Sequence, residues 1–357
     1  MVDFNRRQFA MLGGMTLLGT LAAGSLGACA SAPTAVASPD LGMVDPELRE
    51  AAARILEMSS KGGGYSDETL PAMRERGASF IKPFLPDVPV EERKIPAATG
   101  MPDVAVFVVN GGGDVGRPAI LHTHGGGHIL GSAKGEVPYL QAMARELDCV
   151  IVTVDYRLAP ETKYTGSVED NYAGLLWLYK NAEELGVDRS RIALLGESAG
   201  GTHAALLAIA ARDRGEVPIV LQALIYPMLD DRTGSTRSVP PFIGAIGWDA
   251  KANRYGWTSF LGQDAGSASV PVAGVPARAT DFTGLPPSFI SVGALALFVS
   301  EDIQYANHLI EAGVPTELLV VPGAFHAFDR IGAEAAVSKR FDAAKMAAFR
   351  RAFGQPA

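Results

Sequence analysis

The stretch RIALLGESAGG, residues 191–201, decides the fold of this chain. An apolar run typical of a strand leads to Ser198, and a run of small, helix-forming residues follows it. The sequence therefore predicts a strand, a sharp turn with a serine at its apex, and a helix. The glycines at 196 and 200 allow a strained turn and a close approach of strand and helix. A glycine-rich turn without a chemical role is the alternative that this motif alone leaves open.

A second motif, HTHGGGH at residues 122–128, directly follows the strand-like residues 118–121. Consecutive glycines after a strand let backbone N–H groups point into a cavity, as an oxyanion hole requires. The other donor in such a site is the N–H of the residue after the nucleophile, here Ala199. A flexible turn is the alternative. We discard a phosphate-binding loop because no Lys-Ser or Lys-Thr pair follows the glycines.

The third motif is VVPGAFHAF at residues 320–328, which contains His326. It follows the last strand-like run and precedes the helical C-terminal stretch. A histidine between aromatic residues is on its own more typical of a packed loop. A serine nucleophile followed late in the chain by a histidine is, however, the order expected of a catalytic pair in a strand–turn–helix fold. We therefore predict that His326 is the general base.

Together these motifs resemble the hormone-sensitive-lipase-like (bacterial family IV) esterases of the α/β-hydrolase fold. The resemblance covers about residues 100–330, in the order of the family: HGGG at 124–127, YRLAPE at 156–161, GESAGG at 196–201, YPMLD at 226–230, LPP at 285–287 and PGAFH at 322–326. It implies hydrolysis of carboxylic esters, usually with short acyl chains and without a cofactor, and a homodimer by analogy. The site residues that it implies are the nucleophile Ser198, the base His326, and the oxyanion donors Gly126, Gly127 and Ala199.

One position departs from the pattern of this family. The family carries its triad aspartate shortly after the penultimate strand, where this chain reads GALALFVSED at residues 293–302. The acid's position is Ala296, and Ser300 stands where a second aspartate is usual. Serine is as good a helix N-cap as aspartate, so we expect the change at 300 to be nearly neutral. Alanine accepts no hydrogen bond from an imidazole, so the change at 296 removes a function.

Three explanations of Ala296 stay open at this point. Another carboxylate substitutes for the acid, with Glu301 as the first choice and Asp302 or Asp230 as further candidates. Alternatively, serine and histidine work as a slow dyad, because removing the influence of the acid lowers turnover of a serine protease about 10⁴-fold and still leaves measurable catalysis. In the third explanation the chain binds a ligand without cleaving it, as does the plant gibberellin receptor, which belongs to the same family.

The order of elements predicts an α/β fold, with a mostly parallel central sheet and helices on both faces. With 357 residues, of which 48% are hydrophobic and 20% charged, the chain can bury one large core. We expect strands at residues 104–109, 119–124, 150–155, 191–196, 220–226, 288–293 and 316–321, and helices at 137–147, 168–185, 199–212, 301–312 and 334–353. Ser167 is the expected N-cap of the second of these helices.

Two segments interrupt this alternation, and by the resemblance they form a helical cap over the site. The hydrolase domain is expected over residues 45–357, with its cap from 45–90 and 231–279. An apolar lid excludes water and shapes the substrate pocket. For Trp248 and Trp257 in the second segment, we expect attachment of the cap to the core rather than a place in the pocket.

The first thirty residues are predicted to be an export signal. NRRQF at residues 5–9 resembles a twin-arginine motif, and LGAC at 26–29 resembles a lipobox that would make Cys29 a lipidated N-terminus. Ordinary cleavage near residues 30–32 is the alternative. Residues 31–44 then form a tether. The expected location is the periplasm of a bacterium, or its envelope through the lipid on Cys29.

Composition and spacing argue against nucleic acid and metal as partners. The net charge is −8 and no basic run is present, which disfavours binding of nucleic acid. The partner that we expect is a small-molecule ester. His122, His124 and His128 lie close in sequence, but three histidines around flexible glycines make a weak case for a metal. We therefore expect no metal and no cofactor. Cys149, the other cysteine besides Cys29, opens an apolar strand and is expected to be buried packing.

Overall fold

The computed structural model describes residues 40–97, 100–113 and 116–356. Its strands are β1 Val90–Ile95, β2 Val104–Val109, β3 Arg117–Thr123, β4 Val150–Asp155, β5 Val187–Glu197, β6 Leu221–Ile225, β7 Ser288–Gly293 and β8 Thr316–Val321. They form an eight-stranded sheet in the order β1-β2-β4-β3-β5-β6-β7-β8. The β1–β2 and β2–β4 pairs are antiparallel and every other pair is parallel. The predicted mostly parallel sheet is confirmed.

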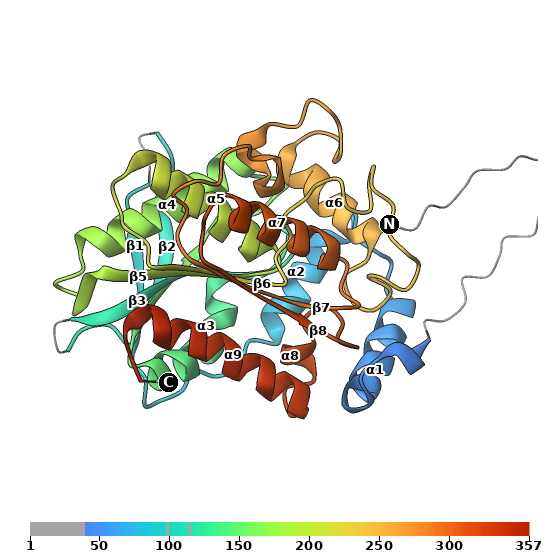
Figure 1. Cartoon of the computed structure of the whole chain (residues 1–357), viewed down its shortest axis with the longest axis horizontal. Helices are drawn as coiled ribbons and strands as arrows, with labels where there is room; N and C mark the ends of the chain where they lie inside the picture. Colours follow the sequence, from blue (N-terminus) through green and yellow to red (C-terminus); the bar gives the residue numbers. More distant parts are fainter. Residues whose placement is uncertain (1–39, 98–99, 114–115, 357) are drawn as a thin grey trace, which may run out of the picture. The chain divides into compact units, whose positions relative to one another are not determined.

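Helices cover both faces of this sheet (Figure 1). The α-helices are α1 Arg49–Ser60, α2 Leu70–Ser79, α3 Ala133–Leu147, α4 Tyr164–Lys180, α5 Ala199–Arg214, α6 Ala250–Leu261, α7 Val299–Glu311, α8 Phe328–Ile331 and α9 Ala336–Phe353. Helices α4, α5 and α7 lie on one face, and α3 and α9 lie on the other. Strand residues alternate between the two cores: Ile151 packs with the α3 and α9 side, whereas Val150 and Val152 pack with the α4 and α5 side. This burial on both faces explains why the central strands are continuously apolar.

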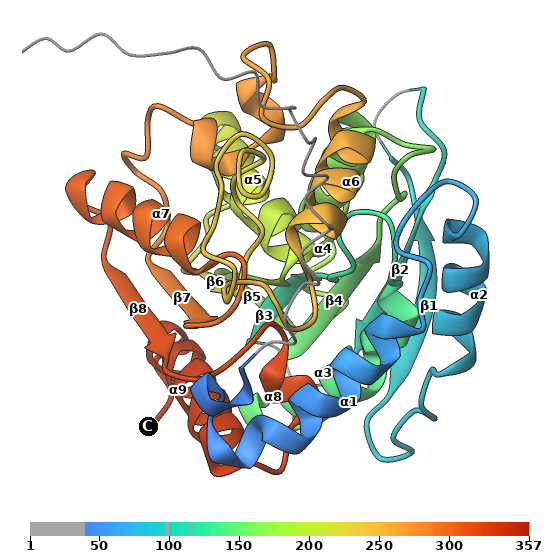
Figure 2. The same ribbon diagram turned by 90° about the vertical axis from the view of Figure 1, so that its right-hand side faces the viewer.

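The two segments that were predicted to form a cap make up two parts of the structure outside the alternation of strands and helices (Figure 2). Helices α1 and α2 precede the sheet, and residues 231–279 contain α6 with two short 3₁₀ turns, Val272–Gly274 and Pro276–Arg278. The Tyr255 hydroxyl of α6 donates to Asp67, which lies just before α2, at 2.7 Å. Arg74 of α2 donates from Nε to the Ile129 carbonyl at 2.8 Å. The two parts are thus joined to each other and to the loop after β3.

Three local expectations need correction. The segment predicted as a tether, residues 31–44, overlaps the folded part, because Val44 is buried and the Asp45 N–H donates to the Gly323 carbonyl at 3.0 Å. Ser167 lies inside α4, which begins at Tyr164, so it is not an N-cap. Ser300 likewise lies in the first turn of α7, whose N-cap position is Phe298. In both helices the chain turns helical a residue or more before the serine.

The predicted signal of residues 1–30 and the rest of the tether up to residue 39 lie outside the described residues. Among the helices of residues 40–356 that are described, none combines the length and the apolarity that a membrane span needs.

Candidate active site

Ser198 occupies the sharp turn between β5 and α5. Its backbone has φ 56° and ψ −119°, a conformation that few residues other than glycine adopt. The turn needs small neighbours: a Cβ on Gly196 would lie 2.2 Å from the Gly200 carbonyl oxygen, and a Cβ on Gly200 would lie 2.0 Å from the Thr123 oxygen. The Ser198 N–H donates to the Ile225 carbonyl of β6 at 2.9 Å, which fixes the turn to the sheet. The strain therefore holds the hydroxyl out at the end of the strand.

His326 reaches this hydroxyl from the loop after β8. Its Nε2 lies 3.0 Å from Oγ of Ser198, although 128 positions separate the two residues in the chain. This is within the range for direct proton transfer. Burial lowers the pKa of the imidazole to about 4, because the charged form is poorly solvated there. At neutral pH the ring is therefore uncharged and able to act as a base.

The glycine loop after β3 lies on the other side of the serine. Gly126 has φ +124° and Gly127 has φ +61°, backbone conformations that favour glycine. A Cβ on Gly126 would lie 2.2 Å from the Leu130 oxygen, and one on Gly127 would lie 2.1 Å from the Trp248 ring. In the described part of the chain, the N–H groups of Gly126, Gly127 and Ala199 donate to no other residue. They are thus available to an oxyanion beside Ser198.

These groups open into one cleft of about 420 Å³. Ser198, His326 and residues 125–127 form one wall, and Tyr65 and Trp248 of the two cap segments form another. The Tyr65 and Trp248 rings meet with their centroids 5.2 Å apart. Trp248 therefore lines the cleft, in contrast to our expectation that it only attaches the cap. Trp257 is completely buried beside Phe260, as expected of a residue that attaches the cap.

The other nitrogen of the His326 ring, Nδ1, has different surroundings. It is buried and has no hydrogen-bond partner among the described residues. Ala296 is completely buried in the turn after β7. The rings of Phe298 and Tyr226 pack against the imidazole in T-shaped arrangements, with centroids 5.2 and 4.9 Å from its own. Among the described residues, no carboxylate accepts a hydrogen bond from Nδ1.

Glu301 does not supply the acid, which corrects our first choice of a substitute. Its Oε1 accepts hydrogen bonds from the N–H groups of Leu229 at 2.7 Å and Asp230 at 3.1 Å. Its Oε2 accepts from the Thr233 hydroxyl. Burial raises the pKa of Glu301 to about 8. The carboxyl group thus holds the start of the second cap segment instead of contacting His326.

The two further candidates are also directed elsewhere. Both carboxyl oxygens of Asp302 are buried without a partner among the described residues, and burial raises its pKa well above the ordinary value. The Asp302 carboxyl group therefore lies inside the core and not at the imidazole. Asp230 forms ion pairs with Arg232 at 2.8 Å and Arg237 at 3.2 Å. Neither residue hydrogen-bonds to the imidazole.

A buried pair behind the nucleophile was not anticipated from the sequence. Oε2 of Glu197, the residue before Ser198, lies 2.8 Å from Nε2 of His122 on β3. The other nitrogen of His122 lies 2.8 Å from the Thr153 hydroxyl on β4. Two features of the sequence could have predicted this pair: the acidic Glu197 at the end of an apolar strand, and His122 within another apolar strand. This chain of contacts ties three strands together directly under the serine.

The other histidines of the glycine motif pack against aromatic rings. His124 stacks on Tyr156 with a centroid distance of 4.2 Å, and His128 stacks on Phe260 at 3.9 Å. Burial lowers the pKa of both imidazoles. Within the ranges that the structure describes, no cluster of three or more His, Cys, Asp or Glu side chains has the geometry to hold a metal.

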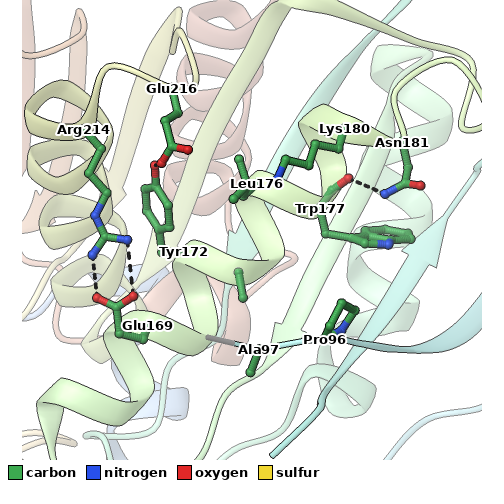
Figure 3. Close-up of a pocket in the computed structure, with 11 residues that line it drawn as sticks. Pro96, Ala97, Glu169, Tyr172, Leu176, Trp177, Lys180, Asn181, Arg214 and Glu216 are labelled. Carbon is green, nitrogen blue, oxygen red and sulfur yellow. Dashed lines mark hydrogen bonds and ion pairs between the residues drawn. The ribbon is translucent and has the colours of Figure 1, made fainter. Parts of the chain in front are cut away.

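A second hollow shows how a cavity without reactive groups differs from this cleft (Figure 3). It measures about 320 Å³ and lies between α4 and the segment after β1. Four of its polar side chains pair with one another: Arg214 pairs with Glu169, and the Tyr172 hydroxyl donates to Glu216 at 2.5 Å. The cleft at Ser198, with its base and its available N–H donors, is the candidate active site.

Comparison with known proteins agrees with this choice. A family model described as alpha/beta hydrolase fold matches residues 120–330, more than half of the chain. Esterase LipI of Mycobacterium tuberculosis is 37% identical over 203 residues, which cover 56% of this chain and 62% of LipI. Carboxylesterase NlhH of the same species is 36% identical over 255 residues, which cover 69% of this chain and 77% of NlhH.

A solved structure is similar over nearly the whole described chain. The structure of a bacterial heroin esterase superimposes with a TM-score of 0.79 at 36% sequence identity, covering 88% of this chain and 99% of that one. Esterase LipW from Mycobacterium marinum superimposes with a TM-score of 0.75 at 31% identity. These similarities extend beyond the motifs to the arrangement of sheet and helices.

Proposed function

The chain belongs to the hormone-sensitive-lipase-like esterases of the α/β-hydrolase fold, and we propose that it hydrolyses carboxylic esters with Ser198 as nucleophile and without a triad acid. The observation that carries this proposal is the distance of 3.0 Å between Ser198 Oγ and His326 Nε2. A reactive pair at this distance, beside free N–H donors, is the arrangement that acyl transfer requires.

The first half of the reaction forms an acyl-enzyme. His326 Nε2 takes the proton of the Ser198 hydroxyl while Oγ attacks the carbonyl carbon of the ester. The negative charge that develops on the carbonyl oxygen is stabilised by the N–H groups of Gly126, Gly127 and Ala199. The imidazolium then gives its proton to the leaving alkoxide, and the C–O bond breaks to release the alcohol.

The second half regenerates the serine. Water gives a proton to the same nitrogen of His326 and attacks the acyl carbon, and the second oxyanion uses the same donors. Collapse of this intermediate breaks the bond to Ser198 Oγ, which takes back the proton from His326. The carboxylic acid leaves.

The surroundings of Nδ1 set the expected rate. In a triad the acid holds the ring in the tautomer with its proton on Nδ1 and stabilises the imidazolium. Here Nδ1 has no such partner in the described part of the chain, so both effects are missing. We expect turnover about 10⁴-fold below that of the same site with an acid.

Hydrolysis of p-nitrophenyl acetate by the wild type and by Ser198→Ala tests the proposal. We expect slow hydrolysis above the buffer rate in the wild type and none above it in the variant, with equal thermal stability of the two. Equal rates in both proteins would remove Ser198 from the reaction. They would favour the alternative, a ligand-binding protein, which also fits the lack of a partner for Nδ1 of His326 among the described residues.

We also propose export by a twin-arginine signal, with lipid attachment at Cys29. The motifs at residues 5–9 and 26–29 support this proposal. A Cys29→Ser variant is expected to move from the membrane fraction of cells to the soluble fraction. An unchanged distribution would contradict the lipid anchor.

A further inference from the structure

The turn that carries Ala296 is fixed against the loop that carries His326. The Ala294 N–H donates to the Val321 carbonyl at 2.8 Å, and the Leu295 N–H donates to the Ala324 carbonyl at 2.9 Å. Ala296 follows directly and is completely buried. The relation of this turn to the imidazole is therefore set by the backbone and does not depend on a side chain at 296.

Two N–H groups of this turn, and the buried Nδ1 of His326, have no hydrogen-bond partner among the described residues. The Ala296 N–H donates to Gly293 and the Val299 N–H donates to Ala296, but the N–H groups of Leu297 and Phe298 donate to no other described residue. Nδ1 of His326, which is 9% exposed as a residue, is buried and has no partner in the described ranges. Buried donors are normally paired. A ligand that accepts hydrogen bonds would satisfy them.

We propose that residues 294–298 and Nδ1 of His326 bind a small carboxylate anion, of the size of formate or acetate, which acts as the acceptor that Ala296 cannot provide. This inference rests on the proposed function, because the bound anion would orient the base of that reaction. One carboxylate oxygen accepts the Nδ1 proton of His326, and the other accepts from the N–H groups of the turn. The imidazole then keeps Nε2 free to accept the proton of Ser198.

The charges nearby allow such an anion. Glu301 and Asp302 stand at the start of α7, directly after this turn. Burial raises the pKa of Glu301 to about 8, so this carboxyl group is mostly neutral at neutral pH and repels an anion little. Burial shifts the pKa of Asp302 in the same direction. The N-terminus of α7, a helix of 13 residues, also favours negative charge.

The surroundings limit the size of the ligand. The rings of Phe298 and Tyr226 flank the imidazole at 5.2 and 4.9 Å, and Leu297 packs against Gly244 of the cap. A formate or acetate ion is close in size to the carboxyl group that Ala296 lacks, whereas a longer acid would have to displace these side chains. Hydrolysis of an acetate ester itself releases an ion of the right size, so the product would stimulate the enzyme.

The test measures hydrolysis of p-nitrophenyl butyrate at neutral pH with increasing sodium formate, against sodium chloride at equal ionic strength. In the wild type we expect a saturable rise in kcat of roughly tenfold, a small part of the ~10⁴-fold deficit. Acetate should act more weakly and butyrate not at all. The Ala296→Asp variant, which carries its own carboxylate, should show no rise, and Ala296→Leu should lose the response.

Equal rates with formate and chloride, up to molar concentrations, would overturn the proposal. So would an equal stimulation of Ala296→Asp. If neither protein shows turnover that depends on Ser198, the proposed function fails, and binding is then measured directly from the NMR resonances of the His326 ring. A formate-dependent shift in the wild type that is absent in Ala296→Asp supports the site, and no shift in either protein overturns it.

Discussion

The two nitrogens of the His326 ring lie in regions of opposite character. Nε2 lies 3.0 Å from a strained serine, beside a glycine loop in which the N–H groups of Gly126 and Gly127 have no acceptor among the residues that the structure describes. At Nδ1, the imidazole has no hydrogen-bond partner among the described residues, and the rings of Tyr226 and Phe298 pack against it. One side is built for reaction, and the other lacks the group that usually supports it.

The difference teaches that nucleophile and acid are encoded separately. The Ser198 turn depends on glycines that no larger residue can replace and on a hydrogen bond to β6. The turn at 294–298 is held by backbone hydrogen bonds to the loop after β8. Both backbones persist whatever side chain stands at 296. Loss of the acid therefore removes one interaction and leaves the reactive geometry in place.

Restoring the acid should produce the largest effect. We expect Ala296→Asp to raise kcat for p-nitrophenyl acetate by about 10³- to 10⁴-fold, because a carboxylate at Nδ1 fixes the tautomer and stabilises the imidazolium. Steady-state kinetics of purified protein measure this change. The matched control is Ala296→Asn, which has the same size and no charge and should recover far less. Equal kcat values in Ala296→Asp and the wild type would mean that Nδ1 does not limit the rate.

A substitution in the oxyanion loop, on the Nε2 side of His326, should have the next largest effect on kcat. Gly127→Ala is expected to lower kcat about 10²-fold, the scale of losing one oxyanion donor. The reason is a Cβ that would lie 2.1 Å from the Trp248 ring on a backbone with φ +61°. Gly313→Ala is the control, since Gly313 has φ +78° and nothing within 4 Å of the added Cβ. A loss of activity of similar size in both variants would point to general strain instead of the oxyanion loop.

The pH dependence of kcat/KM should show a smaller effect, which depends on whether a carboxylate lies at Nδ1 of His326. Burial holds the pKa of His326 at about 4, and only the neutral ring can take the serine proton. The wild-type kcat/KM should therefore stay level down to mildly acidic pH and fall about tenfold per pH unit below pH 4. In Ala296→Asp the acidic limb should move to higher pH, because the carboxylate favours the imidazolium. An unchanged limb in that variant would place the new carboxylate away from Nδ1.

Glu301→Gln should have the smallest effect on the reaction. We expect kcat to change by less than about threefold, since the Glu301 carboxyl bonds to Leu229, Asp230 and Thr233 and not to His326. Thermal unfolding should show a loss on the order of 1 kcal/mol, as expected for weakened buried hydrogen bonds. A large fall in kcat with unchanged stability would restore Glu301 as a participant in catalysis.

The same variant has a pH signature in its stability. The pKa of Glu301 in the fold is about 8, above its ordinary value of 4.5, so the folded state binds the proton more tightly. The stabilisation from this group is complete below the lower value and is lost as the pH rises through the upper one. Glutamine does not titrate. Between the two pKa values of Glu301, the free energy of unfolding should therefore fall less with rising pH in Glu301→Gln than in the wild type.

Apolar periodicity predicted most of the sheet. The seven expected strands match β2 to β8 within a few residues, because strands that are covered on both faces read as nearly continuous apolar runs. The strand β1, Val90–Ile95, was not predicted. It carries four charged residues and pairs on one side only, so neither its composition nor its burial resembles the central strands. Edge strands of this kind are recognised only when their partner is known.

The directions in which side chains of the site point could not be predicted from the sequence. Ser198 and His326 were predicted together because their motifs fix the chain order. Glu301 was chosen for its nearness to Ala296 along the chain, but each helical residue turns about 100° from the one before. That rotation directs Glu301 to the cap segment at residues 229–233 and Asp302 into the core. Sequence distance alone carries no information on this direction.

Intact-protein mass spectrometry after mixing with p-nitrophenyl acetate tests the central claim most directly. We expect an acetyl group on Ser198 in the wild type, which is lost slowly with time. The group should be lost much faster in Ala296→Asp and should never form in Ser198→Ala. An absence of the adduct in the wild type, with ester hydrolysis equal to that of Ser198→Ala, would contradict it.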